Sequence, residues 1–179
     1  IVVALALVTP LALAPSASAA ASGIEPITTD ATPKLPVTVT SDDGTTVDVT
    51  NVSRIVSLSG SLSEAVFVLG LGDHLVGRDI STTFPEAKKV PLVTRGHDVS
   101  AEPVLSRRPT VVLAETDSGP PDALDHIRAA GVPVLTFAQP NSIPGIGERP
   151  VAIGTALGLP DEGAALRART KAEIAEVQA

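Results

Sequence analysis

The chain has 179 residues, a net charge of −7 and 44% hydrophobic residues, but Phe, Tyr and Trp together make up only 2%. This length suits one domain with an aliphatic core. The acidic balance argues against nucleic-acid binding, which needs a basic face, and disfavours peripheral binding to anionic lipid. Because there is no cysteine, we expect no disulfide, no thiolate metal site and no lipid-modified cysteine anchor.

Residues 1–22 form an uncharged segment that runs from an apolar stretch into small residues. Two overlapping triplets, 17–19 and 19–21, fit the small-x-small pattern at which secretory signal peptides are cleaved. A membrane anchor is the alternative, but Pro10 and Pro15 interrupt the run, which is short for a span. We therefore expect an export signal and a mature protein that is periplasmic or at the cell surface.

Residues 23–36 are rich in Pro, Thr and Ala and are expected to form a flexible leader. In residues 37–50, two runs of alternating β-branched residues flank Asp43-Gly44, which is a strong signal for a β-hairpin. Four valines of this hairpin are expected to share one face, two from each arm: Val37, Val39, Val47 and Val49.

From residue 54 to residue 160, short apolar runs alternate with helical patterns. The predicted strands are 54–58, 74–77, 90–93, 110–114 and 132–137, and the predicted helices are 62–69, 101–108, 122–130 and 151–157, with a Pro- and Gly-rich loop over 139–149. A last helix over 161–178 has the charge pattern of a solvated face. This alternation predicts an α/β fold with a doubly wound, mostly parallel sheet, in which ligands bind at the carboxyl ends of the strands.

No catalytic signature is found in the sequence. The segment SLSGSLSE lacks the G-x-S-x-G pattern, and Ser61 with Glu64 fits a helix capping box without any chemistry. His74 and His126 are expected to face solvent, and neither has a metal-like spacing to His97. We therefore expect a binding protein and not an enzyme.

The stretch Thr94–Pro109, TRGHDVSAEPVLSRRP, presents an imidazole and a carboxylate at the end of a strand-loop-helix unit. His97 lies in the loop, Ser100 is the expected helix N-cap, and Glu102 is in the first turn, where a carboxylate suits the helix dipole. Taken alone, these features also fit a surface histidine without a role and an acid that only stabilises its helix.

Four segments taken together carry a family resemblance: RIVSLSGSLSEAVFVLGLGDHLVGRD, FPEAKKVPLV, SAEPVLSRRPTVVLA and HIRAAGVPVLTF. In order and spacing they resemble the substrate-binding proteins of bacterial haem, cobalamin and ferric-siderophore ABC importers. The resemblance implies a two-lobe periplasmic-binding-protein fold whose lobes grip the ligand and are joined by one long helix. Residues 54–160 would form the N-terminal lobe, and residues 161–179 would begin the connecting helix.

The hairpin and the G-H-D-x-S-A-E loop resemble most closely the haem-binding branch from Gram-positive bacteria. This resemblance implies that His97 ligates the haem iron and that a tyrosine of the second lobe ligates its other side. It further implies that Glu102 docks to an arginine of the membrane permease. Arg95 is a candidate contact for a haem propionate, and an exposed, solvated arginine without a role is the alternative for this residue. The expected partners are haem, as transported ligand, and the permease, with no nucleic acid, and the protein is expected to be a monomer.

The sequence departs from this family at two places. Phe84 stands where relatives often carry tyrosine, and Gly145, Gly147 and Pro150 are expected to shorten a helix.

Three alternatives stay open. The same fold can carry a ferric siderophore or cobalamin, in which case His97 has no role. An exported hydrolase or transferase would need a nucleophile and a base, which the sequence does not supply. A surface interaction domain is also compatible with the charge and the leader.

Overall fold

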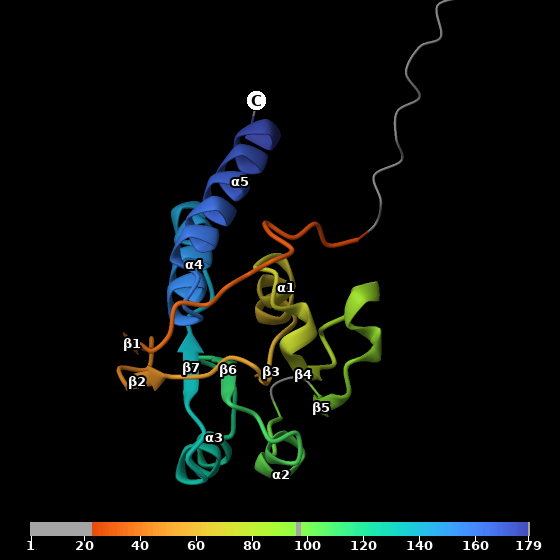
Figure 1. Cartoon of the computed structure of the whole chain (residues 1–179), viewed down its shortest axis with the longest axis vertical. Helices are drawn as coiled ribbons and strands as arrows, with labels where there is room; N and C mark the ends of the chain where they lie inside the picture. Colours follow the sequence, from red (N-terminus) through yellow and green to blue (C-terminus); the bar gives the residue numbers. More distant parts are fainter. Residues whose placement is uncertain (1–22, 96–97, 179) are drawn as a thin grey trace, which may run out of the picture.

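A sheet of five parallel strands forms the centre of the computed structural model, which describes residues 23–95 and 98–178 (Figure 1). In spatial order the strands are β5 (Leu92–Thr94), β4 (Leu75–Asp79), β3 (Ile55–Ser57), β6 (Val111–Glu115) and β7 (Val134–Phe137). Every residue of β3 and β6 is buried, which explains their continuous apolar character in the sequence. The expected export signal at residues 1–22 lies outside the described residues.

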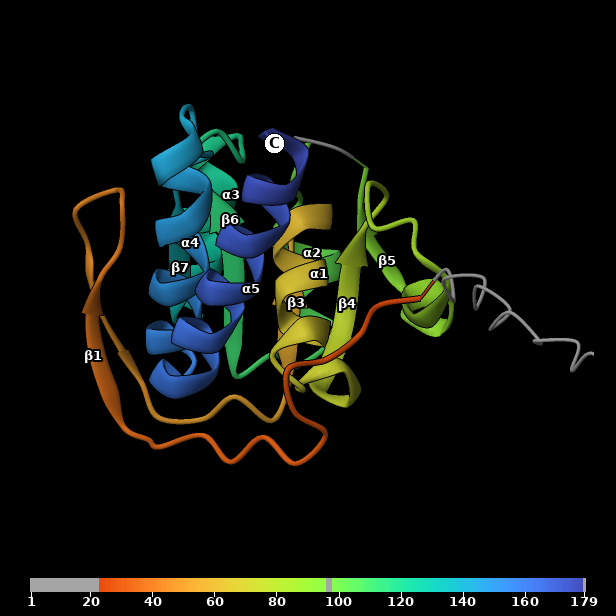
Figure 2. The same ribbon diagram turned by 90° about the horizontal axis from the view of Figure 1, so that it is seen from above.

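Helices cover both faces of this sheet (Figures 1 and 2). On one face lie α1 (Gly60–Val68), α4 (Ile143–Ala156) and α5 (Pro160–Gln178), and on the other lie α2 (Ala101–Leu105) and α3 (Pro121–Ala129). Each face has its own apolar cluster, with Leu62 and Ile153 in the larger and Val104 and Ile127 in the smaller. The α/β, doubly wound fold predicted from the sequence is confirmed.

The predicted strand boundaries are correct to within two residues. His74, the first residue of the predicted strand 74–77, ends the short 3-10 helix η1 (Gly72–His74), which turns the chain from α1 into β4. A second 3-10 helix, η2 (Pro85–Lys89), connects β4 to β5.

The predicted hairpin is present as β1 (Val37–Thr40) and β2 (Thr46–Val49), in the expected antiparallel register. Val37 pairs with Val49 and Val39 with Val47, so the four valines share one face, and Val47 and Val49 enter the larger cluster. The turn satisfies backbone groups of the edge strand β7, because Asp42 N donates to the Thr136 carbonyl at 3.0 Å.

Residues 23–36 pack against the lobe and are not the loose leader that their composition predicts. Four apolar side chains of this segment contact the larger cluster: Ile24, Ile27, Ala31 and Leu35. The Ile27 N–H donates to the Val68 carbonyl at 2.7 Å, and the Lys34 N–H donates to the Gly158 carbonyl at 2.8 Å. The segment has neither helix nor strand, yet these contacts fix it across α1 and the start of α5.

Helix α4 occupies part of the segment that the sequence predicts as a loop over 139–149. Ser142 caps its start by accepting a hydrogen bond from a first-turn N–H, and Pro150 lies inside the helix without shortening it. A methyl group on Gly154 would lie 2.7 Å from the Cα atom of Gly163, so α4 and α5 approach too closely for a side chain there. The loop prediction is wrong because this close packing outweighs the low helix propensity of glycine and proline.

Helix α5 confirms the predicted last helix and extends beyond the sheet (Figure 1). Its first half is held by Gly163 and Leu166, which are buried, whereas most residues after Thr170 are exposed. Among the described residues, no helix combines the length and the apolar character needed to span a bilayer.

Candidate ligand site

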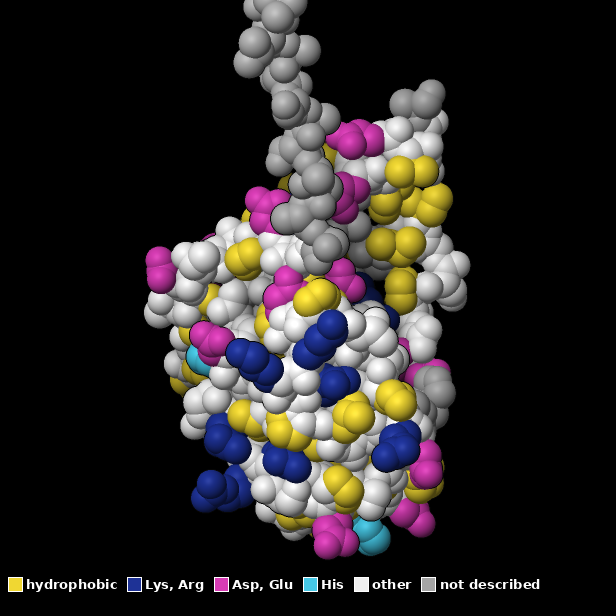
Figure 3. Space-filling model, turned by 90° about the vertical axis from the view of Figure 1, so that its right-hand side faces the viewer, with side chains coloured by type: hydrophobic (Ala, Val, Ile, Leu, Met, Phe, Trp, Pro, Cys, Tyr) yellow, Lys and Arg dark blue, Asp and Glu magenta, His cyan; other side chains and the backbone are white. Residues whose placement is uncertain are grey.

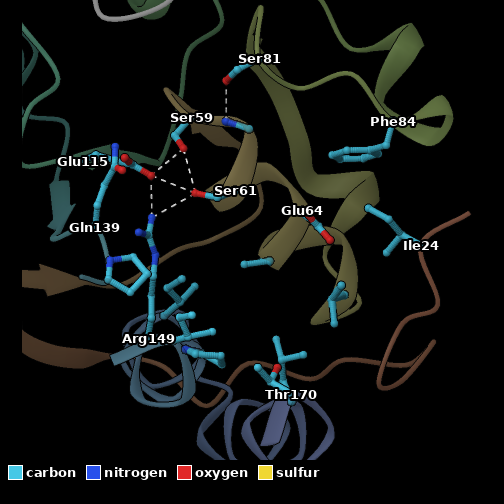
Figure 4. Close-up of a pocket in the computed structure, with 18 of the residues that line it drawn as sticks. Ile24, Ser59, Ser61, Glu64, Ser81, Phe84, Glu115, Gln139, Arg149 and Thr170 are labelled. Atoms are coloured by element: carbon cyan, nitrogen blue, oxygen red, sulfur yellow. Dashed lines mark hydrogen bonds and ion pairs between the residues drawn. The ribbon is translucent and has the colours of Figure 1, made fainter. Parts of the chain in front are cut away.

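The carboxyl ends of β3, β4, β6 and β7 open into a cavity of about 950 Å³ (Figure 4). Its lining comes from one side of α1 along its whole length, from the loops after these strands, from the facing sides of α4 and α5, and from Ile24. Open parallel α/β sheets bind their ligands at this edge, outside the carboxyl ends of the strands. The cavity is therefore the candidate ligand site of the lobe.

A buried polar cluster forms one wall of the cavity (Figure 4). Glu115, at the end of β6, accepts hydrogen bonds at one carboxylate oxygen from Ser59 Oγ at 2.7 Å and Ser61 Oγ at 2.9 Å. The same oxygen receives Arg149 Nη2, from α4, at 2.6 Å. The side chains of Arg149 and Glu115 are only 12% and 6% exposed, so this ion pair ties α4 to the sheet in a largely dry environment.

The cluster keeps Glu115 ionised. Burial by itself raises the pKa of the Glu115 carboxyl group, but the hydrogen bonds from Ser59, Arg149 and Ser61 outweigh it and the pKa is lowered. At neutral pH the wall therefore carries a carboxylate that is paired with a guanidinium, with no net charge. Such a wall offers hydrogen-bonding groups to a ligand but little attraction for a charge of either sign.

The capping box predicted for Ser61 and Glu64 is wrong. Helix α1 begins at Gly60 with Ser59 as N-cap, and the Ser59 side chain makes no capping hydrogen bond. The Ser61 hydroxyl donates to Glu115 instead. The sequence pattern of SLSGSLSE thus favours helix capping, whereas Ser59 and Ser61 belong to the site. A sequence signal for this polar cluster is Glu115, a charged residue at the end of the otherwise apolar strand β6.

The end of β4 is joined to the start of α1 by a second polar contact. Asp79 is 2% exposed and accepts hydrogen bonds from the N–H and the hydroxyl of Ser81. Ser81 Oγ in turn accepts from the Gly60 N–H at 2.8 Å. A Cβ atom on Gly60 would lie 2.5 Å from the Ser81 carbonyl oxygen, so only glycine allows this close approach.

Arg95 and Glu102, two of the residues that the sequence singled out, lie at the same edge of the sheet, on the β5 side. His97 lies outside the described residues; Arg95 and Asp98, which flank its loop, follow β5 and form an isolated bridge. Glu102 is exposed in the first turn of α2, and Ser100 is the N-cap by position, although its hydroxyl makes no capping bond. Neither Arg95 nor Glu102 lines the described cavity.

The two remaining histidines do not contribute to the cavity. His126 is exposed on α3, as expected. His74 is half-buried, with Nδ1 2.9 Å from the Val52 carbonyl, and so has a structural contact that the sequence did not predict. Within residues 23–95 and 98–178, no three acidic, histidine or cysteine side chains are grouped so that they could hold a metal ion.

The sequence of residues 55–179 matches the periplasmic binding protein family. The chain belongs to this family. The matched region contains the whole five-stranded sheet and its covering helices, and it ends in α5. The remaining described residues, the leader and the hairpin, precede the family's match.

Named relatives of this periplasmic binding protein include an ABC transporter substrate-binding lipoprotein and vitamin B12-binding proteins. The chain is 35% identical over 146 residues to an uncharacterized ABC transporter substrate-binding lipoprotein, YvrC, from Bacillus subtilis, which covers 78% of the chain and 46% of the relative. It is 34% identical over 91 residues to a vitamin B12-binding protein from Yersinia pestis, which covers 50% of the chain and 32% of the relative.

A crystal structure of the heme binding protein HmuT superposes on this periplasmic binding protein with a TM-score of 0.82 and 39% sequence identity. The superposition covers 87% of this chain and 51% of the other. The chain thus spans about half the length of the proteins it matches.

Proposed function

We propose that the complete protein is the extracytoplasmic substrate-binding component of an ABC importer, which captures haem and delivers it to a membrane permease. The observation that carries the proposal is the superposition on a heme binding protein at 39% identity over 87% of the chain. The cavity at the carboxyl ends of the strands supports it, because this is where a lobe of this fold class presents its ligand-contacting groups. Binding, and not catalysis, is the proposed activity.

In this proposal His97 supplies one axial ligand to the haem iron. A neutral imidazole nitrogen is a good iron ligand, and Arg95, exposed after β5, is available for a haem propionate. The sequence has no tyrosine, so a tyrosine as second axial ligand has to come from another part of the complete protein. Exposed apolar side chains at the same edge, Ile80 and Ile146, are suited to contact the flat porphyrin.

Cobalamin is the second candidate ligand, because a vitamin B12-binding protein is among the relatives at 34% identity. Cobalamin carries many amide groups. The cluster of Glu115, Arg149, Ser59 and Ser61 has no net charge and offers hydrogen-bonding groups to such amides. Haem and cobalamin absorb at different wavelengths, so titration of the complete protein with each ligand separates the two candidates.

Export is part of the same proposal. Residues 1–22 are proposed to be the signal that directs the protein across the cytoplasmic membrane. The binding component of an importer captures its ligand outside that membrane.

Exchanging Glu102 for arginine should stop delivery without affecting capture. Glu102 is exposed at the positive end of α2, so its carboxylate is free to meet a cation of the permease, where charge sets orientation and association rate. We expect Glu102→Arg to show a normal haem spectrum but at least about tenfold weaker stimulation of ATP hydrolysis by the cognate permease in liposomes. Asp122→Arg, at the first turn of α3, is the matched control. Full stimulation by Glu102→Arg would show that Glu102 only stabilises its helix.

A further inference from the structure

Positive charge is concentrated on one side of this acidic protein. Figure 3 shows Lys and Arg side chains gathered over the middle of the face that carries η2 and β5, with acidic side chains mostly towards its upper and lower margins. Six cations come from this part of the fold and are called the basic face below: Arg54, Arg78, Lys88, Lys89, Arg107 and Arg108.

The cations of the basic face lack acidic partners. Every ion pair found between described residues uses a cation from elsewhere: Lys34, Arg128, Arg149, Arg167 and Arg169. Within the described part of the chain, no carboxylate pairs with a member of the basic face. Among the described residues, its charge is therefore not neutralised by direct ion pairs.

Backbone carbonyl groups hold two of these arginines in place. The Arg54 guanidinium donates to the carbonyl groups of Arg107 and Arg108, and Arg78 Nε donates to the Val90 carbonyl at 2.9 Å. The aliphatic part of Arg107 lies against Gly77 of β4, and its Nε is buried without a hydrogen-bond partner among the described atoms. Carbonyl contacts orient a guanidinium but leave its positive charge available to an external anion.

We infer that the basic face binds the anionic lipid headgroups of a membrane surface. The face is broad, and its cations are spread over strand β4, the 3-10 helix η2 and the segment after α2, which suits an extended anionic surface better than a single small anion. The net charge of −7 does not prevent this, because at physiological salt the Debye length is about 8 Å and carboxylates on the far side are screened.

A nucleic acid fits the basic face less well. The chain has three phenylalanines and no tyrosine or tryptophan, and two of the phenylalanines, Phe67 and Phe84, are packed edge-to-face against each other. Aromatic side chains on which bases stack are therefore lacking. The inference adds a membrane contact to the proposed function, and it does not require that the transported ligand is haem.

The test is sedimentation of the complete protein with vesicles of phosphatidylcholine alone or in an equal mixture with phosphatidylglycerol. We expect binding only to the mixed vesicles and weaker binding as salt is raised to ~0.15 M and beyond. The double variant Lys88→Gln, Lys89→Gln should bind about tenfold less, since each lysine near an anionic surface contributes severalfold. Both lysines are exposed, so the fold should be unaffected.

The matched control is Lys34→Gln, Lys171→Gln, which removes the same charge from exposed positions outside the basic face. Equal loss of binding in the two double variants would overturn the inference, as would absence of binding to the mixed vesicles at low salt. Tighter binding to single-stranded DNA than to the mixed vesicles would also overturn it. A haem titration of the same variants should be unchanged, so failure of the membrane contact and failure of haem binding can be told apart.

Discussion

His97→Ala should weaken haem binding by the complete protein on the order of 100-fold, equivalent to about 2.7 kcal/mol, and shift the Soret maximum. The reason is that the variant removes the proposed axial ligand and leaves water or a weaker donor in its place. In the sequence, His97 belongs to the segment between β5 and α2 that resembles the ligand-binding loop of haem-binding proteins, whereas His74 and His126 do not. Absorbance titration with haemin measures both effects.

His126→Ala is the control for this experiment. His126 is exposed on α3, so its removal should change neither the affinity nor the spectrum. If His97→Ala binds haem with an unchanged spectrum while His126→Ala or His74→Ala does not, His97 is not the ligand.

Arg149→Met should destabilise the fold by about 3 kcal/mol, because it leaves the Glu115 carboxylate buried without its cation. The two side chains are only 12% and 6% exposed, and within the cluster only the Ser59 and Ser61 hydroxyls then remain to hydrogen-bond the carboxylate. Urea denaturation of the complete protein, monitored by circular dichroism, measures the decrease in the free energy of unfolding. The double variant Arg149→Met, Glu115→Leu should recover part of it, since no charge then remains buried alone.

Lys34→Met is the matched control, because it breaks an ion pair whose side chains are 72% and 80% exposed. Its denaturation midpoint should stay close to that of the unchanged protein. A loss as small for Arg149→Met as for Lys34→Met would mean that the buried pair does not hold α4 in place.

The pH dependence of stability should also report Glu115. Its pKa is lowered in the folded protein, so its contribution is complete above the unfolded-state pKa of about 4.3 and is lost as the pH falls through the folded-state pKa. The difference in melting temperature between the unchanged protein and Glu115→Gln should therefore be constant near neutral pH and shrink below about pH 4. A difference that grows on acidification would contradict the lowered pKa.

Local patterns were sufficient to predict the sheet and the hairpin. The strands are short apolar runs bounded by turn residues, and the parallel arrangement follows from their alternation with helices. The hairpin was predicted in register because alternating valines on both sides of Asp43-Gly44 can share a face in one way only.

Helix α4 and the polar cluster could not be predicted in the same way. The helix depends on the approach of Gly154 to Gly163, a contact between positions that local propensity treats independently. The cluster joins Ser59 and Ser61 to Glu115 and Arg149, which lie up to 90 positions apart in the chain. Such contacts follow from the topology and not from any short motif.

The net charge of the sequence does not predict how charge is distributed over the surface, for a similar reason. A value of −7 describes the whole chain, whereas the basic face arises because residues from β4, η2 and the end of α2 come together on one side. Only the fold shows that these cations form no ion pair with a carboxylate of residues 23–95 and 98–178.

Equilibrium titration of the complete protein with haemin, and separately with cobalamin, tests most directly the claim that this periplasmic binding protein captures haem. The proposal predicts a saturable Soret band whose position and intensity differ from those of free haemin, and no saturable change with cobalamin. The band should be lost or shifted in His97→Ala and kept in His126→Ala. Saturable binding of cobalamin, together with a haemin spectrum that does not differ from that in buffer, would contradict haem as the ligand.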